Sequence, residues 1–395
     1  MSTYTYVVQA FRRRVVPVVC AAVTAISLVA ALPASEGSAA VALVATRTTC
    51  DAAVHLSQWT LNRLSAQVVA MPVEADQVGS FAREARTGYG GILLFGTSAP
   101  ASIGATLRQL QASSPQDLGI SVMTDEEGGD VLRLDNLVGP FPWARTMART
   151  MSSAEITSTA RRVGTQLRKA GVTMDLAPVL DVDGRNVDPG VSDPDGYRSF
   201  GGTVPVVVTD GEAFAGGLSA AGVTPVVKHF PGLGGSTGNT DDGPAATKPW
   251  AVLKASALHT FETAINRGAP AIMVANARVP GLTALPASLS SAVMVGVLRN
   301  WLHFKGLIMT DTLTAGAISA VPLSVQAAAA DAIIAGADLV LLGGQPSAGA
   351  DVALSISVSQ AIVSAVNRGR LSRATLVGAV THDLAVRGVE VCPGE

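Results

Sequence analysis

Charged and aromatic residues are both scarce in this sequence of 395 residues, at 15% and 4% respectively. The net charge is only −2, and no basic stripe stands out after the N-terminal segment, which argues against a nucleic-acid partner. Apolar residues make up 48% of the chain, enough to build a sizeable core. The 40 glycines predict many tight turns, as expected where short loops join alternating strands and helices.

Several motifs are missing as well. No G-x-G-x-x-G follows the first predicted strand, and no G-x-S-x-G follows any strand, so nucleotide binding and a serine nucleophile both lack their signatures. Neither a His pair nor a cysteine cluster occurs at metal-ligand spacing. Asp125, Asp181 and Asp311 suit Mg²⁺ by residue type, but Arg198 and Lys228 would compete with the cation. We therefore expect no metal and no cofactor.

The first 40 residues are typical of a targeting segment. Arg12, Arg13 and Arg14 precede an apolar run over 15–32, and small residues follow in ALPASEGSAA. This order predicts a cleaved signal peptide and an exported protein whose remaining domain spans 41–395. The alternative is an uncleaved membrane anchor, because the apolar run is just long enough to span a bilayer.

Only three cysteines are present, and Cys20 lies within the predicted signal. Cys50 and Cys392 remain, one near each end of the predicted domain. In an oxidising compartment this pair predicts a disulfide that joins the chain ends. The alternative is two partly buried free thiols.

Eight short apolar runs alternate with helical segments. Continuous apolar runs of this length are typical of parallel strands that are covered on both faces. The pattern predicts a single (β/α)₈ TIM-type barrel, with an open doubly wound sheet as the alternative. The predicted strands are 68–73, 90–95, 119–124, 172–177, 223–227, 270–275, 306–310 and 337–342.

Helix signals support this reading. Ser152 followed by Glu155 predicts a capping box, and Gly171 lies where a C-terminal glycine belongs. Two further helical segments, 250–268 and 323–337, contain stop signals at Gly268 and Gly336.

Polar residues follow five of the eight predicted strands. They include Asp125, Asp181, Lys228 with His229, Asn276 and Asp311. In a barrel the carboxyl ends of the strands meet at one mouth, so these groups predict a pocket for hydroxyl-rich ligands. Asp125 and Asp311 are expected to act there. Asp181 is expected to be structural and to organise its loop through Asn186.

Five motifs carry a family resemblance: TDEEGGDVLRL, LAPVLDVDGRN, YRSFGG, VVKHFPGLG and GLIMTDTL. In this order they resemble glycoside hydrolase family 3, and most of all its single-domain bacterial β-N-acetylhexosaminidases of cell-wall recycling. The resemblance extends from about residue 60 to about residue 345.

The resemblance implies a retaining glycosidase mechanism. It places the nucleophile on Asp311, which would form a covalent glycosyl-enzyme. The sugar-binding positions fall on Asp125, Arg198, Lys228 and His229, with a further contribution expected from Arg133. These groups would hold the sugar hydroxyls by charge-assisted hydrogen bonds.

The loop after VVKHFPG departs from the family pattern. Leu233 replaces one histidine, Asn239 stands at the aspartate of an Asp-x-His dyad, and Asp241 stands at its histidine, the family's general acid/base. Asp130 also replaces a usual arginine. Three outcomes stay open. Asp241 or its neighbour Asp242 supplies the proton, the enzyme acts slowly on substrates with good leaving groups, or the chain is a glycan-binding pseudoenzyme.

The resulting expectation is an exported glycoside hydrolase, secreted or associated with the cell envelope. It would hydrolyse terminal β-linked sugars, with N-acetylhexosamine residues of peptidoglycan fragments as the expected substrate. The N-acetyl preference rests on the resemblance alone, so a β-glucosidase-like specificity stays open. Membrane contact is expected only through an uncleaved N-terminal segment, and the sequence gives no oligomeric state.

Overall fold

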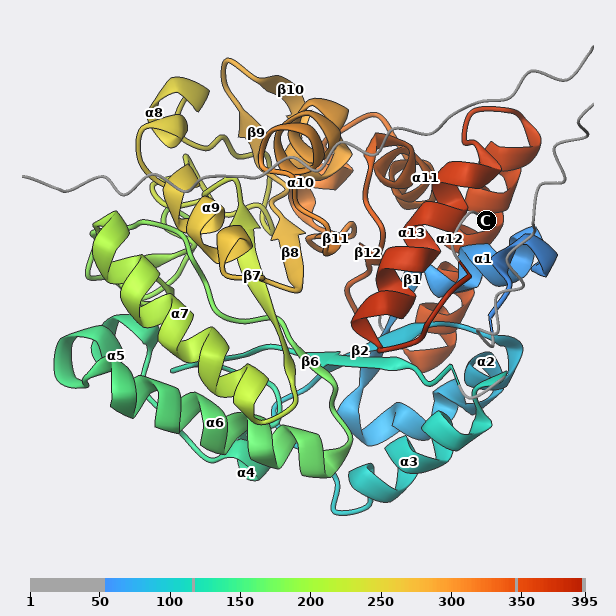
Figure 1. The fold of residues 1–395 in the computed structure, drawn as a ribbon, viewed down its shortest axis with the longest axis horizontal. Helices are drawn as coiled ribbons and strands as arrows, with labels where there is room; N and C mark the ends of the chain where they lie inside the picture. The colour runs from blue at the N-terminus through green and yellow to red at the C-terminus, as the bar shows by residue number, and fades with distance from the viewer. Residues whose placement is uncertain (1–53, 116–117, 345–346, 393–395) are drawn as a thin grey trace, which may run out of the picture. The chain divides into compact units, whose positions relative to one another are not determined.

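A computed structural model describes residues 54–115, 118–344 and 347–392. The predicted targeting segment 1–40 and Cys50 lie outside these residues. Eight parallel strands form the central sheet (Figure 1), and each lies within one of the eight predicted runs or overlaps it. They are β1 (Val69–Glu74), β2 (Gly91–Phe95), β3 (Ser121–Thr124), β6 (Met174–Asp175), β7 (Thr224–Phe230), β8 (Ala271–Val274), β11 (Leu307–Thr310) and β12 (Val340–Leu341).

The strands pair in chain order, and the last returns to the first. The sheet order is β11-β8-β7-β6-β3-β2-β1-β12, so β12 lies beside β1. A parallel bridge between Met309 of β11 and Leu339, just before β12, brings the two ends of the sheet together. The predicted (β/α)₈ barrel is therefore confirmed.

Helices surround the strands (Figure 1). Ten of them are α1 (Leu61–Gln67), α2 (Ala82–Thr87), α3 (Ile103–Ser113), α6 (Ser153–Ala170), α7 (Val204–Ala220), α9 (Leu258–Asn266), the π-helix η6 (Ala292–Trp301), α11 (Val325–Ala335), α12 (Ala348–Asn367) and α13 (Arg373–Val386). Further elements are β4 (Glu126–Gly128), β5 (Val131–Leu132), α4 (Asp135–Val138), α5 (Ala144–Thr150), α8 (Trp250–Lys254), β9 (Arg278–Val279), β10 (Thr283–Pro286) and α10 (Gly316–Ser319), and the 3-10 turns η1 (Leu56–Gln58), η2 (Ala75–Phe81), η4 (Gly196–Arg198) and η5 (Ala287–Leu289).

The predicted helix signals act as expected. Ser152 and Glu155 form a capping box at the start of α6, which ends at Gly171 with φ of 94°. Helix α11 ends at Gly336 with φ of 112°. Residues 250–268 differ, because they form two helices, α8 and α9, instead of one. Between them the Ala255 and Ser256 amides donate to the Val252 and Leu253 carbonyls, three residues back, so the α-helical bonding gives way to tighter turns.

The buried side chains form two main layers. One cluster lies inside the barrel and includes Leu93, Met123, Met273 and Met309. A larger cluster fills the space between the strands and the helices. Because both faces of each strand are covered, the strands are mainly apolar, with polar residues at their ends, which is the pattern that made them recognisable.

The two ends of the described chain lie together. Val54 forms a parallel bridge with Val391, and the Cys392 amide donates to the Val54 carbonyl at 3.3 Å. Cys392 is disulfide-bonded, while its predicted partner Cys50 lies outside the described residues. The pairing of these two cysteines therefore stays a prediction.

One described helix, α12, is long and apolar enough to cross a membrane by length and composition alone. It packs against α1, α11 and β1, as an outer helix of a barrel does, and buries Val358 and Ile362. The same composition is found in core helices of water-soluble proteins, so α12 is weak evidence for a membrane span.

Candidate active site

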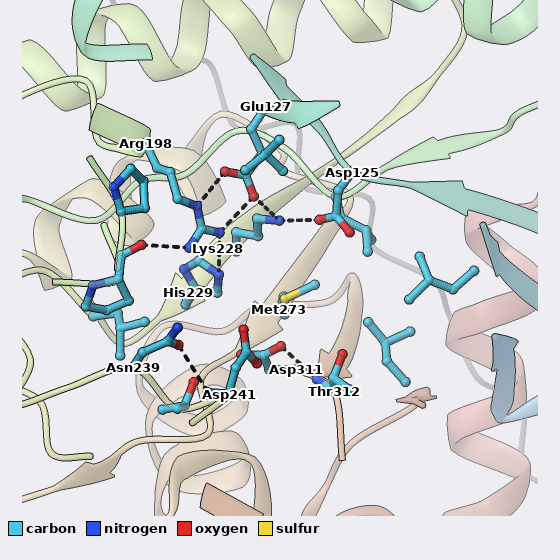
Figure 2. A pocket seen from close by; sticks show the side chains of 18 of the residues that line it. Asp125, Glu127, Arg198, Lys228, His229, Asn239, Asp241, Met273, Asp311 and Thr312 are labelled. Carbon is cyan, nitrogen blue, oxygen red and sulfur yellow. Dashed lines mark hydrogen bonds and ion pairs between the residues drawn. The ribbon is translucent and has the colours of Figure 1, made fainter. Parts of the chain in front are cut away.

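A polar pocket of about 390 Å³ opens at the carboxyl ends of the barrel strands. Its walls come from β2, β7, β8 and the loops after β3, β6, β7 and β11. Barrel enzymes carry their chemistry at this end of the strands. All seven substrate and catalytic residues that the sequence predicts line this one pocket (Figure 2): Asp125, Arg133, Arg198, Lys228, His229, Asp241 and Asp311. Their individual roles remain predictions.

Glu127 joins the cations of the pocket, and the sequence analysis did not assign it a role. Its carboxylate accepts from Arg198 Nε at 2.7 Å and Nη2 at 2.8 Å, and lies 2.6 Å from Lys228 Nζ. Lys228 also contacts Asp125 Oδ1 at 2.6 Å. The bidentate Arg198 contact fixes the orientation of the guanidinium as well as its charge. The sequence signal for this role was the run of acids in TDEEGG, which could pair with the predicted pocket cations Arg198 and Lys228.

This charge network keeps Glu127 and Lys228 ionised although both are buried. Burial alone would raise the pKa of Glu127, but the Arg198 and Lys228 charges hold it well below its ordinary range. Burial alone would lower the pKa of Lys228, but Asp125 and Glu127 raise it. The pocket therefore presents fixed charges, and a sugar hydroxyl placed there meets oriented donors and acceptors without reorganisation of the site.

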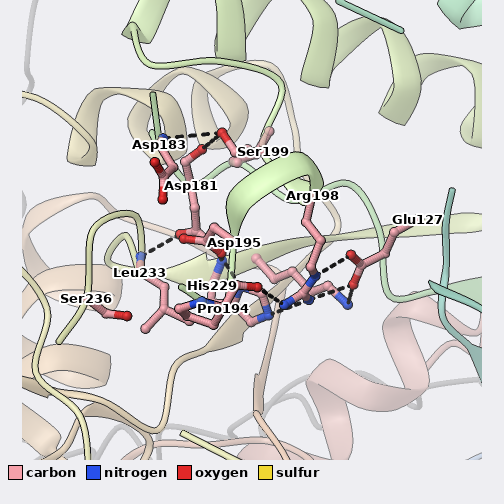
Figure 3. A network of polar contacts seen from close by, with 12 residues as sticks. Glu127, Asp181, Asp183, Pro194, Asp195, Arg198, Ser199, His229, Leu233 and Ser236 are labelled. Atoms are coloured by element: carbon pink, nitrogen blue, oxygen red, sulfur yellow. Dashed lines mark hydrogen bonds and ion pairs between the residues drawn. The ribbon is translucent and has the colours of Figure 1, made fainter. Parts of the chain in front are cut away.

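Asp181 holds His229 in place by two contacts (Figure 3). Asp181 Oδ2 lies 2.7 Å from His229 Nδ1 and accepts its backbone amide at 3.1 Å, while Oδ1 accepts the Leu233 amide at 2.6 Å. Asp181 is thus structural, as expected, but it acts on His229 and Leu233. Asn186, the predicted partner, instead accepts from Arg145.

Asp181, Asp195 and His229 are also the one group of described residues whose ligand atoms lie close enough to hold a metal, within 4.8 Å of one another. The Asp181 oxygens already accept three N–H groups, and Arg198 Nη2 lies 3.4 Å from His229 Nε2. Burial, and then the charge of Asp181, raise the pKa of Asp195 well above its ordinary value. These contacts form a hydrogen-bonded network that orients the His229 imidazole.

Asp311 follows β11 and faces the pocket. Its backbone amide donates to the Val274 carbonyl of β8 at 2.9 Å, and its Oδ1 accepts the Thr312 amide at 2.7 Å. Asn276 supports this turn, because its side chain donates to the Thr312 carbonyl at 2.8 Å and accepts from the Ser288 hydroxyl at 2.6 Å. Asn276 is 1% exposed. Asn276 therefore positions the peptide beside Asp311, whereas its place after a predicted strand had indicated a position at the mouth of the barrel.

The loop over 231–243 brings Asp241 to the pocket. The Asp241 amide donates to Asn239 Oδ1 at 3.1 Å, and the Asp241 carbonyl accepts the Gly316 amide at 2.9 Å. A Cβ at Gly316 would lie 2.8 Å from that carbonyl, so glycine permits the close approach. Leu233, at the position of a family histidine, is buried in a small apolar cluster with Ala245 and other alanines.

Asp241 and Asp311 lie next to one another on the same side of the pocket (Figure 2). Partial desolvation raises the pKa of Asp241, and the negative charge of Asp311 raises it further. A carboxyl group with a raised pKa beside a second carboxyl group is the usual arrangement for a general acid and a nucleophile or base. Both acids of this loop, Asp241 and Asp242, are exposed residues, but Asp242 does not line the pocket.

Arg133 contributes another cation to the wall. Its guanidinium carbon lies 5.7 Å from the centre of the Phe95 ring, and its buried Nε has no hydrogen-bond partner among the described residues. An unsatisfied donor at the edge of a polar pocket suits a ligand oxygen.

A second pair of carboxyl groups is buried beneath the pocket. Glu126 and Asp175 are both fully buried, and the Glu126 amide donates to Asp175 Oδ1 at 2.9 Å. Burial, followed by smaller contributions that include the charge of Asp125, raises the pKa of Glu126 from 4.5 to about 8. Burial, and then the charge of Glu126, raise the pKa of Asp175 well above its ordinary value. Both acids therefore favour the neutral form.

This burial predicts a pH-dependent loss of stability. Folded Glu126 keeps its proton up to about pH 8, whereas the unfolded chain releases it near pH 4.5, so its contribution is full below pH 4.5 and is lost as pH rises through 8. Glu126→Gln keeps the acceptor for Leu134 and removes the titration. We expect it to raise the free energy of unfolding more at pH 8 than at pH 5, measured by urea denaturation. Glu390→Gln, at an exposed acid after α13, is the control, and an equal change at both pH values would contradict the assignment.

A parallel barrel with a charged pocket at the carboxyl ends of its strands has the architecture of a barrel enzyme, and comparison with known proteins identifies the family. The model of the glycosyl hydrolase family 3 N-terminal domain matches residues 65–386, so the chain belongs to this family. The family resemblance of the sequence motifs is thereby confirmed.

Individual relatives agree. The chain is 38% identical over 261 residues to the β-hexosaminidase LpqI of Mycobacterium tuberculosis, covering 64% of this chain and 65% of LpqI. A family 3 glycosyl hydrolase structure from Mycobacterium smegmatis matches with a TM-score of 0.76 and 34% identity, covering 84% of this chain and 98% of that one. A family 3 β-N-acetylglucosaminidase from Paenibacillus matches with a TM-score of 0.75 and 29% identity, covering 85% and 65%. The matched part thus spans slightly less than two thirds of LpqI.

Proposed function

We propose that this protein is an exported glycoside hydrolase that removes terminal β-linked sugars with retention of configuration. The observation that carries the proposal is the pair of neighbouring carboxyl groups, Asp241 and Asp311, in one charged pocket. In this mechanism Asp311 attacks the anomeric carbon and forms a glycosyl-enzyme, while Asp241 protonates the departing oxygen. Asp241 then removes a proton from the water that releases the sugar from Asp311.

The remaining pocket residues bind the sugar in this proposal. Asp125 and the ion-paired Lys228 offer an acceptor and a donor side by side, and Arg198 with His229 offers a second donor group. Because these groups are already fixed by Glu127 and Asp181, they lose little freedom when the sugar binds. Arg133 adds the unpaired donor at the wall.

The raised pKa of Asp241 suits the acid step. A general acid must carry its proton at the working pH, and partial burial beside Asp311 keeps Asp241 protonated to higher pH than an ordinary aspartate. Substrate binding would remove more water from the loop and raise that pKa further. The alkaline limb of the pH profile is therefore assigned to Asp241, with activity falling as pH rises through its raised pKa.

The sugar is proposed from the relatives. The matched LpqI is named a β-hexosaminidase and the Paenibacillus structure a β-N-acetylglucosaminidase, so we propose N-acetylhexosamine residues of cell-wall glycans as the substrate. None of the contacts described above reads an acetamido group. Export is proposed from the basic, apolar and small-residue order of residues 1–40, and N-terminal sequencing of the protein from its native host tests it. The assignment of 41–395 as one domain is proposed with it.

A glycan-binding pseudoenzyme is the second candidate. The observation that favours it is the loss of the dyad imidazole, since Leu233 is buried and Asn239 binds the Asp241 amide instead of a histidine. The pocket would then hold the sugar without efficient proton transfer.

Hydrolysis of an aryl β-N-acetylglucosaminide and an aryl β-glucoside separates these candidates. We expect wild type to hydrolyse the first substrate faster, and Asp241→Ala to lower kcat by about 10²–10⁴-fold, with partial recovery in azide. Asp242→Ala is the matched control and should stay near wild type, because Asp242 does not line the pocket. If wild type binds both sugars but hydrolyses neither, the pseudoenzyme is correct. If only Asp242→Ala loses activity, the acid has been assigned to the wrong neighbour.

A further inference from the structure

Two tryptophans, the exposed Trp301 and the half-buried Trp250, form an aromatic pair outside the pocket. Trp250 begins α8 and Trp301 ends η6, and their rings meet edge to face with centroids 5.8 Å apart at 87°. Trp301 is 51% exposed. In the described part of the chain it is the sole aromatic residue among the exposed large hydrophobic side chains. Since aromatic residues make up only 4% of the chain, a partly exposed pair calls for an explanation.

Three exposed cations, Lys248, Lys254 and Arg278, lie on the segments next to Trp250. Lys254 Nζ lies 5.8 Å from the centre of the Trp250 ring. The backbone beside Lys248 runs along β9, where the Thr247 amide donates to the Arg278 carbonyl at 3.0 Å. The Trp250 amide continues this pairing with the Pro280 carbonyl at 2.8 Å. We call the set of five residues the basic aromatic surface: Lys248, Trp250, Lys254, Arg278 and Trp301.

The charge of this region is opposite to that of the chain as a whole. Residues 247–306 contain six Lys or Arg and one Asp or Glu, a net charge of +5 in a chain of net charge −2. Arg267 and Arg299 are paired with acids elsewhere. Lys248, Lys254 and Arg278 have no acidic partner within 4 Å among the residues that the structure describes. Their spacing along the sequence hides the cluster, which forms only on folding.

Two members of the basic aromatic surface, Lys248 and Arg278, lie at the same end of the barrel as the pocket, whereas Trp301 ends the helix that leads into the start of β11. Strand β9 begins four residues after β8 ends, and Lys248 follows the 231–243 loop (Figure 1). The Lys248 side chain also lies against that loop, with its Cε 2.8 Å from where a Cβ on Gly235 would stand. Lys248 therefore links the basic aromatic surface to the loop that carries Asp241.

We propose that the basic aromatic surface binds an acidic polysaccharide, a glycan strand that bears carboxylates. The tryptophan rings would pack against the apolar faces of pyranose rings, and the three cations would pair with the carboxylates. Charge complementarity selects this occupant, because an uncharged glycan would leave the three cations without partners. The proposal rests on the proposed function only for its choice of a polysaccharide, and binding at the surface needs no turnover.

Co-sedimentation with two insoluble polymers tests the proposal. Peptidoglycan carries carboxylates on a β-linked N-acetylated sugar backbone, and chitin has a similar backbone without them. We expect wild type to bind peptidoglycan more tightly than chitin, with binding that weakens as salt rises. Trp301→Ala and Lys254→Ala should each weaken peptidoglycan binding by about tenfold, the size of one good aromatic or charged contact. Lys169→Ala, an exposed lysine at the end of α6, should bind as wild type does.

Each outcome decides one point. Equal binding to both polymers, or unchanged binding by both variants, would overturn the proposal. Self-association that Trp301→Ala abolishes would also overturn it, because a second copy would then be the occupant. Turnover of a small aryl glycoside should be unchanged in Trp301→Ala and Lys254→Ala, since neither residue lines the pocket. If no variant or wild type hydrolyses that glycoside while the binding differences persist, the proposed function fails and the surface assignment stands.

Discussion

Asp311→Asn is expected to lower kcat on the aryl β-glycoside that wild type prefers by on the order of 10⁴-fold or more. The amide cannot form the glycosyl-enzyme, while the size of the side chain and the Thr312 amide contact to Oδ1 are retained. Sugar binding should therefore remain close to wild type, so the loss is in kcat and not in KM. Steady-state kinetics and isothermal titration with the product sugar measure the two effects separately.

A control variant and a labelling experiment test the assignment of Asp311 as the nucleophile. Asp188→Asn, an exposed acid on the loop before Arg198, should retain full activity. A slow fluorinated glycoside should leave its sugar attached to the peptide that contains Asp311, detected by mass spectrometry. Attachment to another residue, or release of a product with inverted configuration, would show that Asp311 is not the nucleophile.

Lys228→Met is expected to reduce the free energy of unfolding by about 3–5 kcal/mol, because it leaves buried carboxylates without their shared cation. Lys228 is 2% exposed and contacts both Asp125 and Glu127 at 2.6 Å. Urea denaturation at neutral pH measures the loss. Lys169→Met provides the surface control and should change stability by less than about 0.5 kcal/mol.

The partner substitution tests the cause. If Lys228→Met destabilises through unpaired charge, adding Glu127→Gln should restore part of the stability, because a neutral amide needs no cation. Additive losses in the double variant would instead indicate that Lys228 stabilises through packing of its methylene chain. Sugar affinity should stay low in both variants, since the donor to the ligand is missing in each.

The sequence predicted the barrel because its strands are buried on both faces. Each apolar run is bounded by loop residues, and the polar groups that follow the runs had to meet at one mouth. Lys228, His229 and Asp311 were recognisable for this reason. They lie directly at strand ends, where local position in the sequence fixes position in the fold.

Other parts of the site depend on contacts between distant segments. Glu127 lies on the β4 hairpin after β3, and its role is set by Arg198, 71 residues away. Asn276 acts on the Thr312 carbonyl from the neighbouring strand. The sequence placed both near the mouth, but only the fold shows which group each one contacts. The break between α8 and α9 was missed, because the tight turns at Ala255 and Ser256 leave no periodic signal in the sequence.

The meeting of the chain ends has a consequence for how the protein is held in its surroundings. Val54 pairs with Val391, and Arg387, four residues earlier, donates to the carbonyls of Gly90 and Gly119, which precede β2 and β3. The described chain therefore starts and finishes near the amino ends of the strands, whereas the pocket opens at their carboxyl ends. Any tether attached ahead of Val54 would join the barrel at its base. A protein held in that way would turn its mouth outward, and its point of attachment would lie at the opposite end from the pocket.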